Sequence, residues 1–292
     1  MAQKTLLITI GIPCYNAERF IELAIKSVLC QTYDNFELII TDDGSQDKTV
    51  EIIRQFTDSR IKLVSDNINR GISFRLNQQI DMAKGDIFVR MDADDLMFPT
   101  RLEHLICYLE SNPEIDVVGS SAVVINNDNQ IIGIRLSSYD FSQPLSFDRS
   151  AIFIHPTVAG RTKWFRKYHY KDEFNGCEDC NLWIRSYAES KFYIIPEPLY
   201  FYREPLIFKL STYLFRKKQG RKMRIAERKY VNNNLLLLFF ILKSYLSGFA
   251  AIMFHLCKRD KQMIAKRNDE ISLQDRIEYD EILRKIISFK LK

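Results

Sequence analysis

The sequence predicts an α/β fold, in which a mostly parallel central sheet is flanked by helices and is followed by a helical, basic C-terminal tail. Up to about residue 135, short apolar runs alternate with helical patterns. Two of these runs end in aspartate clusters, and the net charge changes from negative to positive near residue 208. Because strands separated by helices are typical of parallel β-α-β units, we expect the first part of the chain to form one α/β domain.

The first strand and helix follow directly from the apolar pattern. Residues 6–12 form a continuous apolar run, which predicts a buried strand. Asn16 is the expected N-cap of a helix whose apolar residues recur at helical spacing up to Leu29. The same alternation continues and predicts strands at residues 36–40, 61–64 and 86–91 and helices at residues 47–56, 72–83 and 100–109.

After residue 110 the pattern changes. An Asn-Asn-Asp-Asn turn at residues 126–129 separates two apolar segments, which predicts a β-hairpin. Pro196 and Pro198 interrupt a later apolar segment and favour two short strands over one long strand. The elements expected in this part are hairpin strands at residues 116–125 and 130–136, a helix at residues 178–188, and strands at residues 192–195 and 199–202.

The composition is typical of a globular protein with a sizeable core. Apolar residues make up 46% of the chain and aromatic residues 12%, which argues against intrinsic disorder. Six cysteines lie mostly in apolar surroundings, as reduced thiols do in cytosolic proteins. Cys177 and Cys180 form a C-x-x-C pair, but zinc is not expected there because no matching second pair of ligands is present. Residues 1–10 run directly into a strand pattern without a cleavage site, so no secretory signal is predicted.

Acidic side chains follow two strands of the predicted sheet. Asp92-Ala93-Asp94-Asp95 ends the strand at residues 86–91, and Asp42-Asp43 ends the strand at residues 36–40. Isolated clusters of this kind are commonly solvated turns that cap a following helix. Two strand ends at one edge of a sheet instead favour a binding site. Carboxylate oxygens are the ligands of hard divalent cations, which also bridge to nucleotide phosphates.

The ordered motifs resemble those of the family 2 glycosyltransferases, of the bacterial surface-polysaccharide type, which have the GT-A fold. The resemblance covers about residues 5–205 and does not extend to the tail. It rests on six segments in order, which are residues 12–17, residues 42–45 with Asp47 and Thr49, residues 69–71, residues 83–86, residues 92–95, and Glu178-Asp179 with Leu182-Trp183. Together they imply a GT-A nucleotide-sugar transferase.

The resemblance also implies a nucleotide site. It makes Pro13 and Tyr15 one wall of the base site, where a planar base packs on an aromatic ring. Asp43 is implied as the base-reading residue, because a carboxylate accepts the imide N–H of uracil. Gly71 is expected to let the backbone approach the nucleotide, whereas Asp42 is expected to be structural.

The same resemblance assigns the metal and the catalytic residues. Asp92 and Asp94 form the Asp-X-Asp pair, in which Asp94 binds Mn²⁺ or Mg²⁺ and Asp92 contacts the ribose or the metal through water. The metal neutralises charge on the departing nucleoside diphosphate. Asp95 is expected to cap the following helix. Asp179 is the expected general base, oriented by Glu178, and direct displacement with inversion is favoured because no second nucleophilic carboxylate is evident.

Three further residues have a structural and a functional alternative. Trp183 is expected to pack in the core rather than to stack on a sugar. His155 either lines the acceptor cleft or is structural. Arg203 occupies the place of a family Tyr-Arg pair that would contact the diphosphate.

The tail is strongly basic. Residues 1–208 contain 22 Lys/Arg against 29 Asp/Glu, a net charge of −7, whereas residues 209–292 contain 20 against 8, a net charge of +12. Eight of these cations lie within residues 216–229. Nucleic acid is not the expected partner, because aromatic platforms are missing.

Residues 235–257 form an apolar segment long enough to span a bilayer. Lys243 near its middle would cost about 2.5–3.5 kcal/mol in a spanning helix, and basic clusters flank both ends. An interfacial helix or shallow hairpin on the inner leaflet of the cytoplasmic membrane is therefore favoured, with spanning and packing on the catalytic domain as alternatives. The chain is thus divided into a catalytic domain at residues 1–210 and a membrane-associated region at residues 211–292.

Taken together, the sequence predicts a cytoplasmic, inverting, metal-dependent glycosyltransferase at the membrane. The expected donor is a nucleotide sugar in which the sugar is linked to UDP. The expected acceptor is a hydroxyl of a glycan or of a lipid-linked saccharide. The alternatives are a nucleotidyltransferase, which should show an early Gly-rich phosphate loop that residues 12–17 lack, and a catalytically inactive nucleotide-binding module. Dinucleotide oxidoreductases and P-loop kinases are excluded because neither glycine motif is present.

Overall fold

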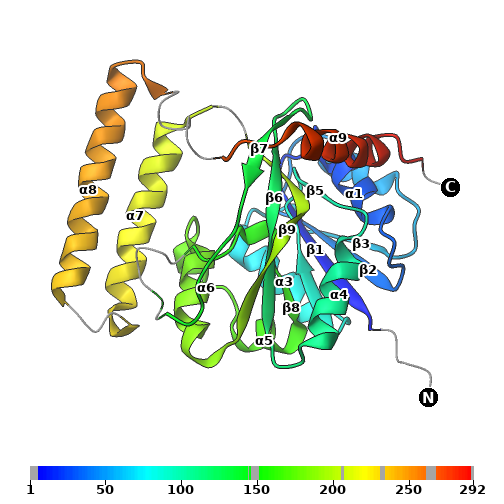
Figure 1. The fold of residues 1–292 in the computed structure, drawn as a ribbon, viewed down its shortest axis with the longest axis horizontal. Helices are drawn as coiled ribbons and strands as arrows, with labels where there is room; N and C mark the ends of the chain where they lie inside the picture. Colours follow the sequence, from blue (N-terminus) through cyan, green and yellow to red (C-terminus); the bar gives the residue numbers. More distant parts are fainter. Residues whose placement is uncertain are drawn as a thin grey trace.

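The computed structural model describes residues 6–143, 145, 151–204, 207–230, 234–260 and 268–290, and within them nine strands form one sheet flanked by helices (Figure 1). The strands are β1 (Ile8–Cys14), β2 (Phe36–Asp42), β3 (Ile61–Ser65), β4 (Ile87–Arg90), β5 (Leu96–Met97), β6 (Val117–Ile125), β7 (Ile131–Arg135), β8 (Ala159–Arg161) and β9 (Phe192–Arg203). The helices are α1 (Ile21–Leu29), α2 (Thr49–Arg54), α3 (Ile72–Met82), α4 (Arg101–Ser111), α5 (Thr162–Lys167), α6 (Glu178–Ser186), α7 (Leu210–Ala226), α8 (Asn234–Leu256) and α9 (Leu273–Ile287).

The α/β fold predicted from the sequence is confirmed, but the sheet is mixed: among the described strands, four pairs are parallel and four are antiparallel. The order across the sheet is β3-β2-β1-β4-β8-β6-β9-β5, and β7 pairs with the outer part of β6 as the predicted hairpin. Strands β3, β2, β1 and β4 are parallel neighbours, and β6 is parallel to β9. The carboxyl ends of β1, β2 and β4 therefore lie at one edge of the sheet, where both aspartate clusters follow.

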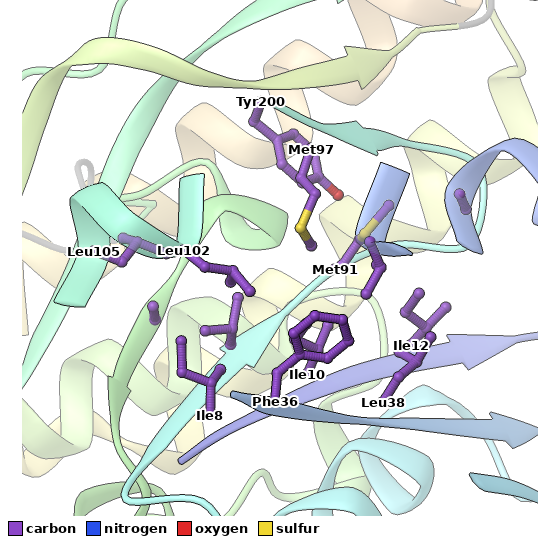
Figure 2. Packing of buried hydrophobic residues seen from close by; sticks show 14 of the residues in the cluster. Ile8, Ile10, Ile12, Phe36, Leu38, Met91, Met97, Leu102, Leu105 and Tyr200 are labelled. Atoms are coloured by element: carbon purple, nitrogen blue, oxygen red, sulfur yellow. The ribbon is translucent and has the colours of Figure 1, made fainter. Parts of the chain in front are cut away.

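Helices cover both faces of the sheet because side chains alternate along the buried strands. Ile87 and Val89 of β4 pack in one hydrophobic cluster, whereas Phe88 packs in another on the opposite face. Figure 2 shows the first cluster, in which residues of β1 and β2 pack against Leu102 and Leu105 of α4. The second cluster joins α3, α5 and α6. Packing on both faces holds the strands in place, and with them the residues that follow their carboxyl ends.

The first predicted helix begins later than expected. Its first residue is Ile21, so Asn16 is not its N-cap. Asn16 instead has a φ of 49° and joins two loops, because its backbone N–H donates to Ser45 Oγ at 2.9 Å and its Oδ1 accepts the Gln46 N–H at 2.8 Å. Asn tolerates this left-handed backbone better than most residues, which explains its place in the turn.

The two short strands expected around Pro196 and Pro198 are one strand, β9. Its register with β6 shifts between Ser120 and Ser121, where Ile195 and then Pro198 are paired. This irregularity removes the need for a ladder N–H at the prolines, so the strand continues through them.

The C-terminal region separates into two parts. Figure 1 shows α7 between α8 and the α/β domain, with α8 on the outer side. In contrast, α9 packs against the sheet domain, since Leu283 and Ile286 join a cluster with Leu96 and Phe201 and residues Ile134 and Asp269 form a β-bridge. The boundary at residue 210 coincides with the first residue of α7. The division of the chain into 1–210 and 211–292 remains a prediction, and α9 lies with the first part.

Candidate active site

The acidic cluster lies at the end of β4. One carboxylate oxygen from each of Asp92, Asp94 and Asp95 lies within 4.8 Å of the others. Asp95 was expected to cap the next helix, but this expectation is wrong because the N-cap of α4 is Thr100. Asp95 is buried instead, and its Oδ1 accepts the backbone N–H of Arg203 at 2.6 Å.

Three residues outside the cluster hold it in place. Nη2 of the buried Arg90 donates to Asp92 Oδ1 at 2.6 Å, and the backbone N–H of Asp92 donates to the Tyr200 hydroxyl at 3.1 Å. Arg203 Nε donates to the Asp94 carbonyl oxygen at 2.6 Å. The guanidinium of Arg203 also binds the Asn126 carbonyl, so the group considered for a diphosphate contact joins the acidic turn to the hairpin loop.

The electrostatics of the cluster fit a divalent cation. Burial and the nearby Asp92 raise the pKa of Asp94 to about 6. Burial and then Asp94 raise the pKa of Asp95 well above its usual value. Oδ2 of Asp95 is buried and has no hydrogen-bond partner in the described part of the chain. Closely spaced carboxylates repel one another in a site poor in water, and a hard cation with oxygen ligands relieves this repulsion.

Beside the cluster lies a small cavity of about 260 Å³. Pro13, Tyr15, Asp92 and Asp94 all line it. The Tyr15 side chain is half exposed, which leaves its ring accessible to a planar group. The structure therefore brings together the residues predicted for the base wall and those predicted for the metal.

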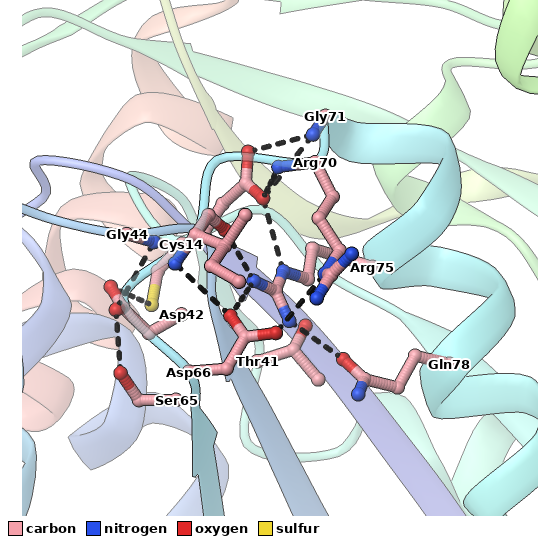
Figure 3. Close-up of polar contacts among 12 residues, drawn as sticks. Cys14, Thr41, Asp42, Gly44, Ser65, Asp66, Arg70, Gly71, Arg75 and Gln78 are labelled. Carbon is pink, nitrogen blue, oxygen red and sulfur yellow. Dashed lines mark hydrogen bonds and ion pairs between the residues drawn. The ribbon is translucent and has the colours of Figure 1, made fainter.

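Asp43 directly follows β2 and accepts hydrogen bonds from Arg70, Gly71 and Arg75, which are labelled in Figure 3. Its backbone N–H donates to the Cys14 carbonyl at 2.8 Å. Its Oδ1 accepts the Arg70 backbone N–H at 2.8 Å and Arg75 Nε at 3.0 Å, and its Oδ2 accepts the Gly71 N–H at 3.0 Å. These donors hold the Asp43 carboxylate in one orientation.

Gly71 and Asp42 stabilise the loops around Asp43 in two different ways. Gly71 has a φ of 89°, and a Cβ there would lie 2.8 Å from Asn175 Nδ2, so the position requires glycine. Asp42 is fully buried and accepts hydrogen bonds from the Gly44 N–H at 3.2 Å and from Ser65 Oγ at 2.9 Å. Asp42 thus has the structural part expected of it.

A larger cavity, of about 670 Å³, also reaches the acidic cluster. Asp92, His155, Glu178 and Asp179 line it. Asp92 also lines the small cavity, so the two spaces meet at this residue. Asp179 lies in the first turn of α6, where the positive end of the helix dipole favours a carboxylate.

Glu178 and His155 line the large cavity, and each makes a hydrogen bond that holds its side chain. Oε2 of Glu178 accepts the Gly176 N–H at 2.6 Å, and burial followed by Asp179 raises the Glu178 pKa. His155 Nε2 pairs with the Tyr170 hydroxyl at 2.9 Å, and burial and the charge of Arg90 hold its pKa well below its usual value. A neutral His155 therefore faces the cleft. Trp183 is fully buried among aromatic rings, as predicted.

Sequence reasoning missed Arg75, Arg90 and Tyr200. All three are buried. Arg75 contacts Asp43 and Tyr200 contacts Asp92 across long sequence separations, whereas Arg90 is a residue of β4 that contacts Asp92. The sequence does contain one signal, a lone arginine at the end of an apolar strand two residues before Asp92. A buried arginine needs an anionic partner, and the nearest downstream carboxylate is Asp92.

Replacing Arg75 with Met is expected to lower the free energy of unfolding by about 3–5 kcal/mol, because it leaves two carboxylates without their buried cation. Arg75 is fully buried and pairs with both Asp43 and Asp66. Arg70→Met is the matched control, since Arg70 is 39% exposed and its pair with Asp66 should contribute about 1 kcal/mol or less. Urea denaturation of both variants tests this, and similar losses would contradict it.

Comparison with known proteins identifies similar sequences. The family model described as Glycosyl transferase family 2 matches residues 9–169. EpsE of Bacillus subtilis (strain 168) is 34% identical over 197 residues, which cover 65% of this chain and 70% of EpsE. WfgD of Escherichia coli is named a UDP-Glc:alpha-D-GlcNAc-diphosphoundecaprenol beta-1,3-glucosyltransferase. It is 36% identical over 127 residues, which cover 44% of this chain and 49% of WfgD.

Solved structures share the fold. The S. aureus TarS 1-349 structure in complex with UDP aligns with a TM-score of 0.62 at 17% identity and covers 97% of this chain and 80% of that chain. The mannosyltransferase PcManGT from Pyrobaculum calidifontis, in complex with GDP-Man and Mn²⁺, aligns with a TM-score of 0.56 at 16% identity. That alignment covers 96% of this chain and 84% of PcManGT.

Proposed function

Because the chain belongs to glycosyl transferase family 2, we propose that it moves a sugar from a UDP-linked donor to a hydroxyl of a glycan or lipid-linked saccharide, with inversion, in polysaccharide biosynthesis. One observation carries this proposal. Asp92 joins a cavity lined by Pro13, Tyr15 and Asp94 to a larger cavity lined by Asp179. Donor and acceptor can therefore meet at Asp92.

In the proposed donor complex, Tyr15 and Pro13 pack against the base, and Asp43 accepts its imide N–H. The carboxylate of Asp43 is an acceptor only, which fits the imide N–H that uracil presents. The fold is shared with a TarS structure solved with UDP. Asp94, with Asp92 and Asp95 beside it, is proposed to bind Mn²⁺ or Mg²⁺. When bound, this ion neutralises charge on the departing nucleoside diphosphate.

Asp179 is proposed as the general base in the larger cavity. Its carboxylate accepts the proton of the acceptor hydroxyl while the hydroxyl oxygen forms a bond to the anomeric carbon. The bond between that carbon and the diphosphate oxygen breaks, and its electron pair leaves with the nucleoside diphosphate. Glu178 orients the start of α6 through the Gly176 N–H. Attack opposite the leaving group inverts the anomeric configuration.

A lipid-linked acceptor is proposed from the surface of α8. This helix buries small and polar residues against α7, among them Ser244 and Gly248, and exposes most of its large apolar side chains. It is long and apolar enough to cross a membrane by length and composition. An exposed apolar face of this size, next to the basic helix α7, fits the surface of an anionic membrane. The acceptor named for WfgD is also attached to a lipid. We therefore propose a cytoplasmic protein bound to the inner leaflet.

The function is tested by incubating the full chain with a panel of UDP-sugars, Mn²⁺ and a bacterial lipid extract, and measuring UDP release. We expect release with one donor, stimulated by the lipid extract and lost in EDTA. Donor binding without any release would favour the inactive-module alternative. Release of pyrophosphate from a nucleoside triphosphate and a sugar phosphate would favour the nucleotidyltransferase alternative.

Substituting the exposed face of α8 is expected to detach the protein from membranes. Leu246 and Phe249 are 69% and 64% exposed, so Leu246→Glu with Phe249→Glu should leave the fold intact. Each substitution removes about 1.5–3 kcal/mol of apolar burial in the bilayer, so cosedimentation with phosphatidylglycerol vesicles should fall about tenfold or more. Leu273→Glu is the control, because Leu273 is 76% exposed on α9. Unchanged cosedimentation of the α8 variant would contradict membrane binding by this face.

A further inference from the structure

A third cavity, distinct from the two described above, adjoins the proposed catalytic cleft. It has a volume of about 440 Å³ and lies between the turn before α6 and helices α7 and α8. Four of its lining side chains are cationic, namely Arg216, Lys217, Arg224 and Lys243. None of the lining residues that the structure describes carries a carboxylate. Arg216 and Lys217 therefore bring two cationic groups to one space, which an anion would stabilise.

The cations of α7 are not equivalent. Arg216 and Lys217 line the cavity, whereas the next residue, Lys218, does not. Arg221 Nη1 donates to Ser244 Oγ at 3.1 Å, and Lys222 Nζ donates to the Glu173 carbonyl at 3.1 Å. The basic segment therefore contains cations that line the cavity and cations that do not. A purely diffuse attraction to an anionic surface would not require this separation.

The basic cavity is continuous with the cleft that contains Asp179. Gly176, Cys180 and Arg216 line both spaces. It shares no lining residue with the small cavity at Tyr15 and Asp94, where the donor diphosphate is proposed to lie. An anion in the basic cavity would thus belong to the acceptor and not to the donor. Ser244 also lines the cavity, and its hydroxyl, which accepts Arg221 Nη1, can donate its own proton to a phosphate oxygen.

We propose that this cavity binds the diphosphate of a lipid-linked acceptor. The saccharide then extends into the cleft toward Asp179, and the hydrocarbon chain leaves along α8, which lines the cavity and exposes apolar side chains. This inference rests on the proposed glycosyl transfer and adds to it the group that positions the acceptor. Lys217 and Arg216 provide the charges that recognise the diphosphate.

Binding of geranyl diphosphate to the full chain tests the cavity directly. Geraniol is the probe without the diphosphate, and EDTA prevents the acidic cluster from holding a diphosphate through a metal. By equilibrium dialysis, the wild type should bind geranyl diphosphate more tightly than geraniol. Lys217→Gln should weaken geranyl diphosphate binding about tenfold, the effect of one charge-assisted contact, and Lys217→Arg should restore it. Lys218→Gln should change the affinity less than about twofold.

Several results would overturn the proposal. Equal weakening by Lys217→Gln and Lys218→Gln would indicate diffuse attraction, and equal binding of geraniol would indicate an apolar site only. Phosphatidylglycerol vesicles test a membrane headgroup as the source of the phosphate. Vesicle binding that depends on Lys217 more than on Lys218, without a matching effect on geranyl diphosphate, would assign the cavity to the headgroup.

A transfer assay separates this proposal from the proposed function. With an active lipid-linked acceptor, Lys217→Gln should raise the acceptor KM about tenfold and leave the donor KM unchanged. An unchanged acceptor KM would overturn the diphosphate site while glycosyl transfer stands. Failure of the wild type to turn over any donor would instead count against the proposed function, and the geranyl diphosphate result would still decide the cavity.

Discussion

Asp179→Asn is expected to lower the rate of sugar transfer by about 10²–10⁴-fold while donor binding stays unchanged. The amide has the same shape as the carboxylate but cannot accept the proton of the acceptor hydroxyl. Asp179 lines the large cavity and not the small one, so the proposed donor contacts remain intact. Initial rates of UDP release with acceptor give the first quantity, and the thermal shift produced by the donor with Mn²⁺ gives the second.

Glu178→Gln separates catalysis from local structure. Glu178 is buried and its carboxylate accepts the Gly176 N–H, a bond that the glutamine oxygen can keep. We therefore expect this variant to retain much more activity than Asp179→Asn. A loss of donor binding in Asp179→Asn, or equal activity losses in the two variants, would contradict the assignment of Asp179 as the base.

The placement of the acidic residues was predictable because it depends on local patterns. Apolar runs identify β2 and β4, and parallel pairing brings the residues that follow them to one edge of the sheet. Asp42, Asp43 and the cluster from Asp92 onward are where this reasoning placed them. The resemblance to a family added their roles, which periodicity alone does not give.

The contacts that support these residues were not predictable in the same way. Arg75 lies 32 residues from Asp43, and Arg203 lies 108 residues from Asp95. Such pairs form only when the whole fold brings them together, and no local pattern encodes them. The return of α9 to the sheet domain has the same cause, because its few inward apolar residues, such as Leu283, do not reveal their partner.

Asp94→Asn is expected to abolish the stabilisation of the protein by donor with Mn²⁺, through a loss of about a hundredfold or more in metal affinity. Asp94 belongs to the three-carboxylate cluster and also lines the proposed donor cavity. Removing its charge takes away an oxygen ligand while the backbone contact from Arg203 Nε to the Asp94 carbonyl can remain. Thermal shift with Mn²⁺ and UDP, compared with EDTA, measures the loss.

Without a metal, Asp94→Asn is expected to increase the stability of the folded protein. Burial and the charge of Asp92 raise the pKa of Asp94 from 3.8 to about 6, so the folded state disfavours the charged form. The folded chain then binds this proton more tightly than the unfolded chain, so the contribution of Asp94 to the free energy of unfolding should fall as the pH rises from 4 to 7. In EDTA at pH 7.5, Asp94→Asn should therefore be more stable than the wild type, by up to about 3 kcal/mol.

Near pH 4 this advantage should disappear, because Asp94 is then protonated in the folded wild type. Saturating Mn²⁺ at pH 7.5 should reverse the order of stability, since it stabilises the wild type and not the variant. Urea denaturation at both pH values, with EDTA or Mn²⁺, gives all of these comparisons. If Asp94→Asn were less stable than the wild type in EDTA at pH 7.5, the three carboxylates would not be strained by their proximity, and the main physical reason for placing a cation among them would be lost.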